Sequence, residues 1–179
     1  GEGPGNTDCL RLDIGDYQGW DGFVSPSLTG LFAEGHNLLT FLGKGDARTS
    51  QLAIEIQEQD GSRWIATAEL STEWQRTSLG IADFRYWPDS PTKETRGQAA
   101  DQLNPGQAAR LNFGLASTHT PAVGGGAHTV WIADLGTAKN PFAGSATGKP
   151  QLSGTIPTIY PRYKVHPISQ PASARDTGF

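Results

Sequence analysis

Short segments in which apolar and polar residues alternate recur along the chain, and turn-forming residues separate them. This period of two is typical of β-strands that bury one face, whereas the helical period of about 3.6 residues is almost absent. The two clearest segments, residues 50–58 and 62–70, are joined by Asp60-Gly61. Together the segments predict an all-β fold, a β-sandwich jelly roll of about eight antiparallel strands. The other predicted strands are residues 10–14, 36–42, 74–79, 84–87, 110–116 and 129–135.

The length of the loop between the two clearest strands decides which side chains share a face. A two-residue loop would place Ile54 and Ile56 on the face opposite Trp64. A three-residue loop that ends at Gly61 pairs Ile56 with Trp64 instead and gathers most apolar residues on one face. We therefore expect a bulged turn in which Gly61 adopts the left-handed conformation.

The other face of this hairpin carries polar side chains. In the preferred register Glu55 lies opposite Ile65 and Glu69 lies opposite Gln51, so the two acids are expected to be solvated or hydrogen-bonded rather than a catalytic pair. Amide, carboxylate and guanidinium groups are suited to binding sugar hydroxyls, although any solvated sheet face shows the same alternation. The predicted outward residues are Gln51, Glu55, Gln57, Arg63, Thr67 and Glu69.

Two longer stretches, residues 88–109 and 118–127, interrupt the strand pattern. Loops longer than about 12–15 residues in a compact domain are commonly functional. Residues 1–7 are expected to form a flexible leader and residues 8–138 the β-sandwich. The Gly- and Pro-rich residues 139–179 are expected to form an extended tail, either a connector or the start of a following domain.

Charge and composition exclude several classes of function. The chain of 179 residues has 14 Lys and Arg against 18 Asp and Glu, a formal net charge of −4, and no basic stripe, which argues against nucleic-acid binding. No apolar run approaches the roughly 20 residues of a spanning helix, so no membrane insertion is expected. The single cysteine, Cys9, cannot form an internal disulfide or a cysteine-rich zinc site.

The five tryptophans are the most informative side chains. Trp64 and Trp74 are expected in the core. Trp20, Trp87 and Trp131 occupy turn-rich or out-of-phase positions, where an indole can either anchor a loop or stack on the apolar face of a pyranose ring.

Two histidines and three aspartates are candidate metal ligands. His119 and His128 flank a run of three glycines but have no evident third partner, so they are expected to be loop residues or ligand contacts. Asp13, Asp16 and Asp134 stand at segment edges, and their hard oxygen atoms suit calcium, although the spacing is not that of an EF-hand.

The order of strand ends and turns over residues 8–138 resembles non-catalytic carbohydrate-binding modules of the galactose-binding-like jelly-roll superfamily, in particular family 11-type modules attached to glycoside hydrolases. This resemblance implies a polysaccharide ligand, such as a β-glucan or another plant or algal glycan, and a catalytic domain in the same parent chain. It also implies a structural calcium that ties the first strand to the last, and we expect a secreted or cell-surface location. The segments that carry the resemblance are Leu39-Thr40-Phe41, Lys44-Gly45-Asp46, Asp60-Gly61-Ser62-Arg63-Trp64, Glu73-Trp74-Gln75-Arg76, Ala82-Asp83-Phe84 and Ile132-Ala133-Asp134-Leu135.

The leading hypothesis is therefore a binding module with stacking aromatic residues and hydrogen-bond donors. An alternative is a jelly-roll polysaccharide lyase, in which Tyr86, His119 or His128 is the base and Arg96 neutralises a substrate carboxylate. A protein-interaction domain of the same fold is a third hypothesis. The predicted sugar contacts are Trp87, Tyr86, Trp131, Arg63, Arg96, His119 and His128, and the predicted calcium ligands are Asp13, Asp16 and Asp134.

Overall fold

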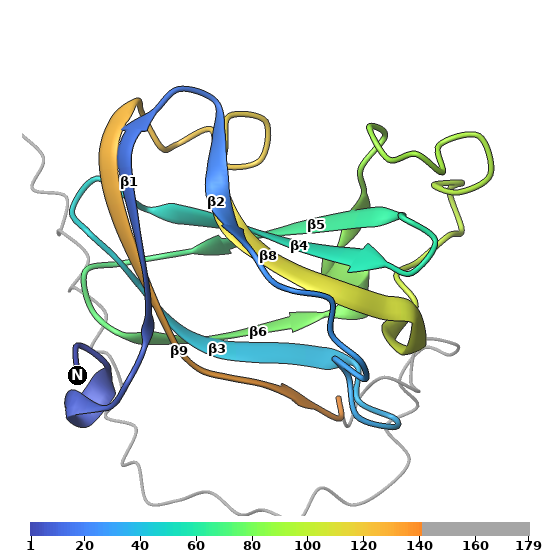
Figure 1. The fold of residues 1–179 in the computed structure, drawn as a ribbon, viewed down its shortest axis with the longest axis horizontal. Helices are drawn as coiled ribbons and strands as arrows, with labels where there is room; N and C mark the ends of the chain where they lie inside the picture. The colour runs from blue at the N-terminus through green and yellow to red at the C-terminus, as the bar shows by residue number, and fades with distance from the viewer. Residues whose placement is uncertain (141–179) are drawn as a thin grey trace, which may run out of the picture. The chain divides into compact units, whose positions relative to one another are not determined.

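Two antiparallel sheets face each other in the computed structural model, which describes residues 1–140 (Figure 1). The four-stranded sheet has the order β1-β9-β3-β6, and the five-stranded sheet has the order β2-β8-β4-β5-β7. The prediction of an all-β jelly-roll sandwich is therefore confirmed, with nine strands in the described residues. The strands are β1 (Leu10–Tyr17), β2 (Trp20–Val24), β3 (Leu38–Gly45), β4 (Gln51–Glu58), β5 (Arg63–Glu69), β6 (Gln75–Gly80), β7 (Arg85–Tyr86), β8 (Ala108–Ala116) and β9 (Gly126–Ala138).

Helical structure in residues 1–140 is limited to three short 3-10 turns, Pro4–Asn6, Ile81–Asp83 and Pro105–Gln107. No helix in this part of the chain has the length and hydropathy needed to cross a membrane.

The hairpin of β4 and β5 has the predicted register. Ile56 lies opposite Trp64 and Glu55 lies opposite Ile65. Gly61 has a φ of 89°, and its N–H donates to the Glu58 carbonyl oxygen at 3.0 Å. The left-handed glycine thus closes a three-residue loop, and the period of two then places the apolar side chains between the sheets.

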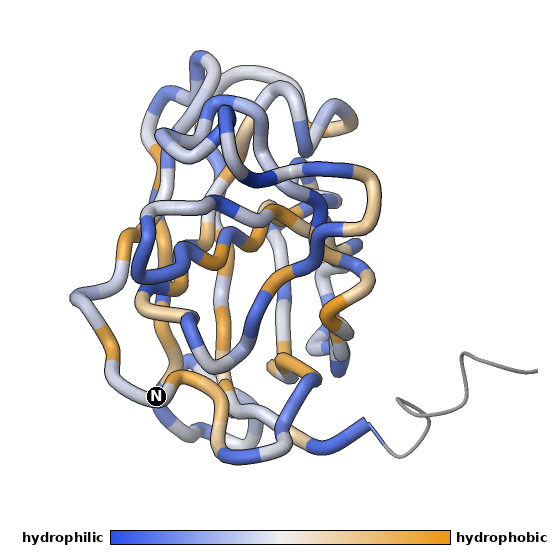
Figure 2. The backbone as a smooth tube through the Cα atoms, turned by 90° about the vertical axis from the view of Figure 1, so that its right-hand side faces the viewer, coloured by the Kyte–Doolittle hydropathy of each residue, from blue (hydrophilic) through white to orange (hydrophobic). Residues whose placement is uncertain are grey.

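The core lies between the two sheets, and hydropathy alternates along the strands that enclose it (Figure 2). Phe41 of β3 and Phe113 of β8 meet edge to face across the sandwich, with ring centroids 5.7 Å apart. Trp64 is 2% exposed, as predicted for a core residue, whereas Trp74 is only half-buried just before β6. β3 lies inside its sheet, between β9 and β6, so both of its edges are hydrogen-bonded to neighbouring strands.

Strand β2 was not predicted. All five of its residues are exposed, so the sequence shows no buried alternation there. Its pairing with β8 depends on a close approach at Gly22 and Gly114, which lie opposite each other. A Cβ at Gly22 would lie 2.4 Å from the Phe113 carbonyl oxygen, so only glycine permits this strand spacing.

The leader, residues 1–7, contacts the four-stranded sheet through Glu2. The Glu2 carboxylate accepts hydrogen bonds from Trp131 Nε1 at 2.6 Å and from Arg11 Nη1 at 2.8 Å. At the other end of the sandwich β9 ends at Ala138. Most of the predicted connector of residues 139–179 lies outside the described residues.

Candidate functional site

The outer face of the five-stranded sheet has small and apolar residues at its centre. Ala53, Ile65 and Ala116 are at most 2% exposed, although they alternate with the residues that point into the core. Trp87 packs against these three side chains from outside. An aromatic side chain therefore shields this part of the sheet from solvent.

Three aromatic side chains, Trp20, Trp87 and His119, form a continuous strip over this floor, which we call the aromatic strip. The ring centroids of Trp20 and Trp87 are 5.0 Å apart, and those of Trp87 and His119 are 5.2 Å apart. Trp20 begins β2 and Trp87 follows β7, so the strip is built from the two opposite edges of the sheet. Trp20 is 45% exposed, and its indole is the most accessible surface of the strip.

An ion pair between a half-buried arginine and a buried glutamate lies beside the aromatic strip. Arg63 Nε and Nη2 each donate to a carboxylate oxygen of Glu55 at 2.8 Å, and the guanidinium lies 4.1 Å from the Trp87 ring centroid. The hydrogen bonds to Glu55 raise the pKa of Arg63. Glu55 is hydrogen-bonded as expected, but it is 2% exposed rather than solvated. The pair therefore holds Trp87 in place without leaving a net charge.

His119 joins the strip as a neutral ring. Burial lowers the pKa of His119, and the charge of Glu55 opposes this shift without reversing it. Thr67 of β5 donates to the His119 carbonyl oxygen at 2.7 Å, which fixes the loop after β8 to the sheet. At neutral pH the imidazole thus adds an uncharged aromatic surface next to Trp87.

Asn112 supplies an unpaired acceptor on the same face. Its side chain is 8% exposed, and Oδ1 has no hydrogen-bond partner among the described residues. Asn112 lies opposite Glu55 on one side and Val24 on the other. A buried acceptor without a partner is uncommon and favours an ordered water or a ligand hydroxyl at this position.

Three of the seven predicted contact residues, Trp87, Arg63 and His119, come together in this way. Trp131 does not join them, because it lies on the outer face of the four-stranded sheet, between Arg11 and Lys44.

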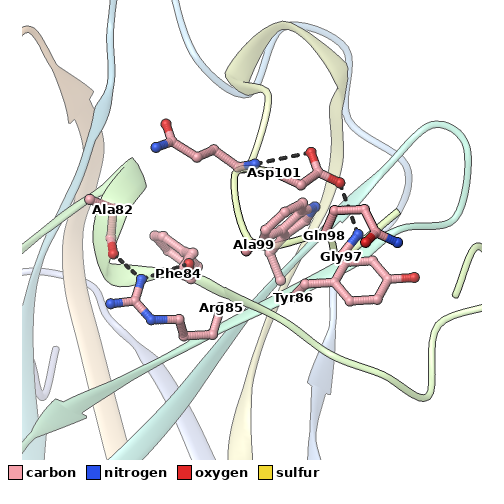
Figure 3. Close-up of a pocket in the computed structure, with 10 residues that line it drawn as sticks. Ala82, Phe84, Arg85, Tyr86, Gly97, Gln98, Ala99 and Asp101 are labelled. Atoms are coloured by element: carbon pink, nitrogen blue, oxygen red, sulfur yellow. Dashed lines mark hydrogen bonds between the residues drawn. The ribbon is translucent and has the colours of Figure 1, made fainter. Parts of the chain in front are cut away.

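Tyr86 and Arg96 belong to the loop end of the sandwich instead. Tyr86 meets Trp64 edge-on at 5.3 Å and lines a pocket of about 440 Å³ beside residues 97–102 (Figure 3). Arg96 forms ion pairs with Glu58, at 2.8 Å, and with Asp60 and Asp101. Arg96 thus folds the long loop onto the β4–β5 turn and has little capacity left for a ligand.

His128 is 2% exposed and structural. Its Nδ1 lies 2.9 Å from Thr49 Oγ1, and its Nε2 lies 2.8 Å from the Gly124 carbonyl oxygen. His128 lies on β9 of the four-stranded sheet, whereas His119 lies in the loop after β8 and packs against Trp87, so the two histidines belong to different places in the fold. Of the three candidate bases in the lyase hypothesis, Tyr86 lies at the same loop end as Arg96, whose guanidinium is paired with Glu58, Asp60 and Asp101.

The three predicted calcium ligands do not fit one shared ion. Asp13 is held by Arg11 and Thr129, and Asp16 by Gln18. Asp134 lies at an irregularity of β9 with a φ of 47° and pairs with Arg76. Residues 1–140 contain no group of three or more His, Cys, Asp or Glu side chains that could hold a metal. Calcium binding stays a prediction for which these residues give no common site.

Trp20 completes the site but was not among the predicted contacts. The sequence identified Trp20 as one of three tryptophans that could either anchor a loop or stack on a sugar ring, but its turn-rich surroundings gave no sign of the strand that begins there.

No protein-family model matches the chain, and no curated protein matches it. Solved structures do match. The family 11 carbohydrate-binding module from Clostridium thermocellum, in complex with a β-1,3-1,4-mixed-linked tetrasaccharide, aligns with a TM-score of 0.52 at 15% identity over 74% of this chain and 83% of its own. The family 11 module of the cellulosomal cellulase Lic26A-Cel5E of the same organism aligns with a TM-score of 0.51 at 13% identity, over 74% and 82%.

A solution structure of CtCBM11 aligns with a TM-score of 0.52 at 11% identity, over 75% of this chain and 91% of its own. At these identities the likeness shows the fold alone. The chain therefore has the jelly-roll β-sandwich fold of the family 11 carbohydrate-binding modules.

Proposed function

We propose that this chain is a non-catalytic module that binds a polysaccharide along the outer face of the five-stranded sheet. The aromatic strip is the observation that carries this proposal. A row of uncharged rings, tilted by 44° and 57° to one another, offers apolar surface to the faces of sugar rings.

Polar groups beside the strip suit the hydroxyls at the edges of the sugar rings. Arg63 has donors that Glu55 does not use, and Asn112 Oδ1 is an acceptor without a partner in the described residues. This combination of stacking rings and planar hydrogen-bonding groups favours a neutral glycan over an anionic one.

The structural neighbours suggest which glycan to try first. One family 11 module was solved with a β-1,3-1,4-mixed-linked tetrasaccharide, so a mixed-linkage β-glucan is the first probe. Another belongs to a cellulosomal cellulase, which supports a glycoside hydrolase domain in the parent chain and a secreted or cell-surface location here.

Affinity electrophoresis in gels containing mixed-linkage β-glucan, xyloglucan or agarose tests the proposal. We expect at least one of these polymers to retard the protein, and Trp20→Ala to weaken that retardation by about tenfold or more. Trp131→Ala is the matched control, because it removes an indole from the other sheet and should leave the retardation unchanged. No retardation by any neutral polymer, or equal loss in both variants, would contradict the proposal.

A further inference from the structure

The outer face of the four-stranded sheet carries a second aromatic site, in which a tryptophan lies between two cationic side chains. Arg11, Trp131 and Lys44 lie side by side on β1, β9 and β3 in direct cross-strand register. The Arg11 guanidinium carbon lies 5.6 Å from the Trp131 ring centroid, and Lys44 Nζ lies 5.0 Å from it. We call these three residues the cationic row.

The cationic row already binds a carboxylate, that of Glu2 from the leader. One Glu2 oxygen accepts from Trp131 Nε1 at 2.6 Å, and the other accepts from Arg11 Nη1 at 2.8 Å. The hydrogen bond from Trp131 lowers the pKa of Glu2, so the charged carboxylate is the bound form. An indole N–H and a guanidinium thus hold the two oxygens of one carboxylate.

Glu2 is held loosely enough to be exchanged. The Glu2 side chain is 54% exposed and that of Arg11 is 45% exposed, and ion pairs between such exposed groups contribute little to stability. Lys44 forms no ion pair with any described residue, whereas Asp13 pairs with Arg11. Without Glu2 the row has two cations against one neighbouring acid.

Space for a ligand is present next to the row. A gap of about 410 Å³ separates the leader from the outer face of the four-stranded sheet. Ala133, two residues beyond Trp131 on β9, lines this gap together with Leu42, Pro4 and Thr7 and the carboxylates of Asp8 and Asp134, which can accept hydrogen bonds from sugar hydroxyls. A ring that extends from the carboxylate position along β9 would enter it.

We propose that the cationic row binds a uronic acid residue of an acidic polysaccharide, with the sugar carboxylate taking the place of Glu2. The charge balance of the site is unchanged by this exchange, and the sugar ring extends from the carboxylate position along β9 into the gap. The inference does not rest on the proposed function, because the row lies on the sheet opposite the aromatic strip.

Isothermal titration calorimetry with trigalacturonate tests the exchange. Removing the internal competitor should strengthen binding, so we expect Glu2→Gln to bind at least threefold more tightly than the unaltered chain. Lys44→Gln and Trp131→Ala should each weaken binding at least fivefold. All of these side chains are at the surface, and circular dichroism and thermal unfolding would verify that the variants fold.

Two controls separate this site from non-specific attraction and from the proposed glycan face. The fully methyl-esterified trisaccharide lacks the charge and should not bind, while Trp20→Ala should bind trigalacturonate as the unaltered chain does. Absence of binding by Glu2→Gln, or binding that Trp131→Ala leaves intact, would overturn the inference. Neither result bears on retardation by neutral polymers, so the two proposals fail separately.

Discussion

Two buried glutamates of β4 are partners of arginines in the fold. Glu55 is bound by Arg63, and the side chain of Glu58, which is 1% exposed, is bound by Arg96. Hydrogen bonds to Asp101 and Glu58 raise the pKa of Arg96, and the same contact lowers the pKa of Asp101. Through these ion pairs the acids hold loops to strands.

Arg96→Ala should destabilise the protein by about 3 kcal/mol, because Glu58 would remain buried without a cation. Urea unfolding followed by tryptophan fluorescence measures the change. Arg110→Ala is the control, since Arg110 is exposed on β8, and a change within about 0.5 kcal/mol is expected there. Equal effects in both variants would show that the Arg96 ion pairs contribute nothing specific.

His119 should make the stability depend on pH below neutrality. Its pKa in the folded chain lies below the ordinary value of 6.5, so the unfolded chain binds a proton first as the pH falls. The free energy of unfolding should therefore decrease from about pH 6.5 downward until the folded-state pKa is passed. Urea midpoints at pH 7 and pH 5 should differ less in His119→Gln than in the unaltered chain. An identical difference would exclude His119 as a source.

The sequence predicted part of the site at this scale. It identified Trp87, Arg63 and His119, because aromatic and planar polar residues on an outward strand face or next to a loop are visible in the pattern. It grouped Trp131 with them because periodicity shows that a side chain points outward but not from which sheet. The pairing of strands distant in sequence decides that, and here it places Trp131 beside Lys44.

At the scale of elements, the glycine pair of β2 and β8 sets the position of the aromatic strip. Gly22 and Gly114 let the two strands approach so closely that any Cβ there would overlap backbone atoms, which cannot move aside. Trp20 lies two residues before Gly22 and reaches over the sheet from this edge. The geometry of the strip therefore depends on two residues that have no side chain.

Gly22→Ala should destabilise the protein by about 1–3 kcal/mol and weaken polysaccharide retention, because β2 must move away from β8 and take Trp20 with it. Thermal unfolding and affinity electrophoresis measure both effects. Gly15→Ala is the matched control on β1, where a Cβ has nothing within 4 Å. If both variants behave alike, the close approach does not position Trp20.

Strands could be predicted from the sequence where one face of the strand is buried and the other is exposed. The β4–β5 register was predictable because a shift of one residue would have exposed Ile54 and Ile56, which are fully buried. Strand β2 has no buried face, so its sequence shows no alternation of apolar and polar residues. It is a strand because it pairs with β8 and because its glycine permits the close approach, and neither feature produces a periodic pattern in the sequence.

At the scale of the whole molecule, the sandwich has two outer faces with different electrostatics. The aromatic strip consists of neutral rings beside the Arg63–Glu55 ion pair, whereas the cationic row has exposed charges. Retention by a neutral glycan should change by less than about twofold between 0.05 and 1 M NaCl, because salt screens exposed charges and not stacking. Affinity electrophoresis at both salt concentrations measures this, and a strong salt dependence would place the neutral glycan elsewhere.

Because β1 and β9 are adjacent, the place where the protein is attached to a support decides which outer face stays accessible. Since the first and last strands are neighbours in one sheet, both junctions of the sandwich with flanking polypeptide belong to the layer away from Trp20. A carrier, label or resin attached at either junction would leave Trp20 directed outward, toward a fibre or a gel matrix. The same attachment would hinder access to Trp131, which lies on the sheet that contains both junctions. Immobilised protein should therefore bind ligands at the aromatic strip better than at the cationic row.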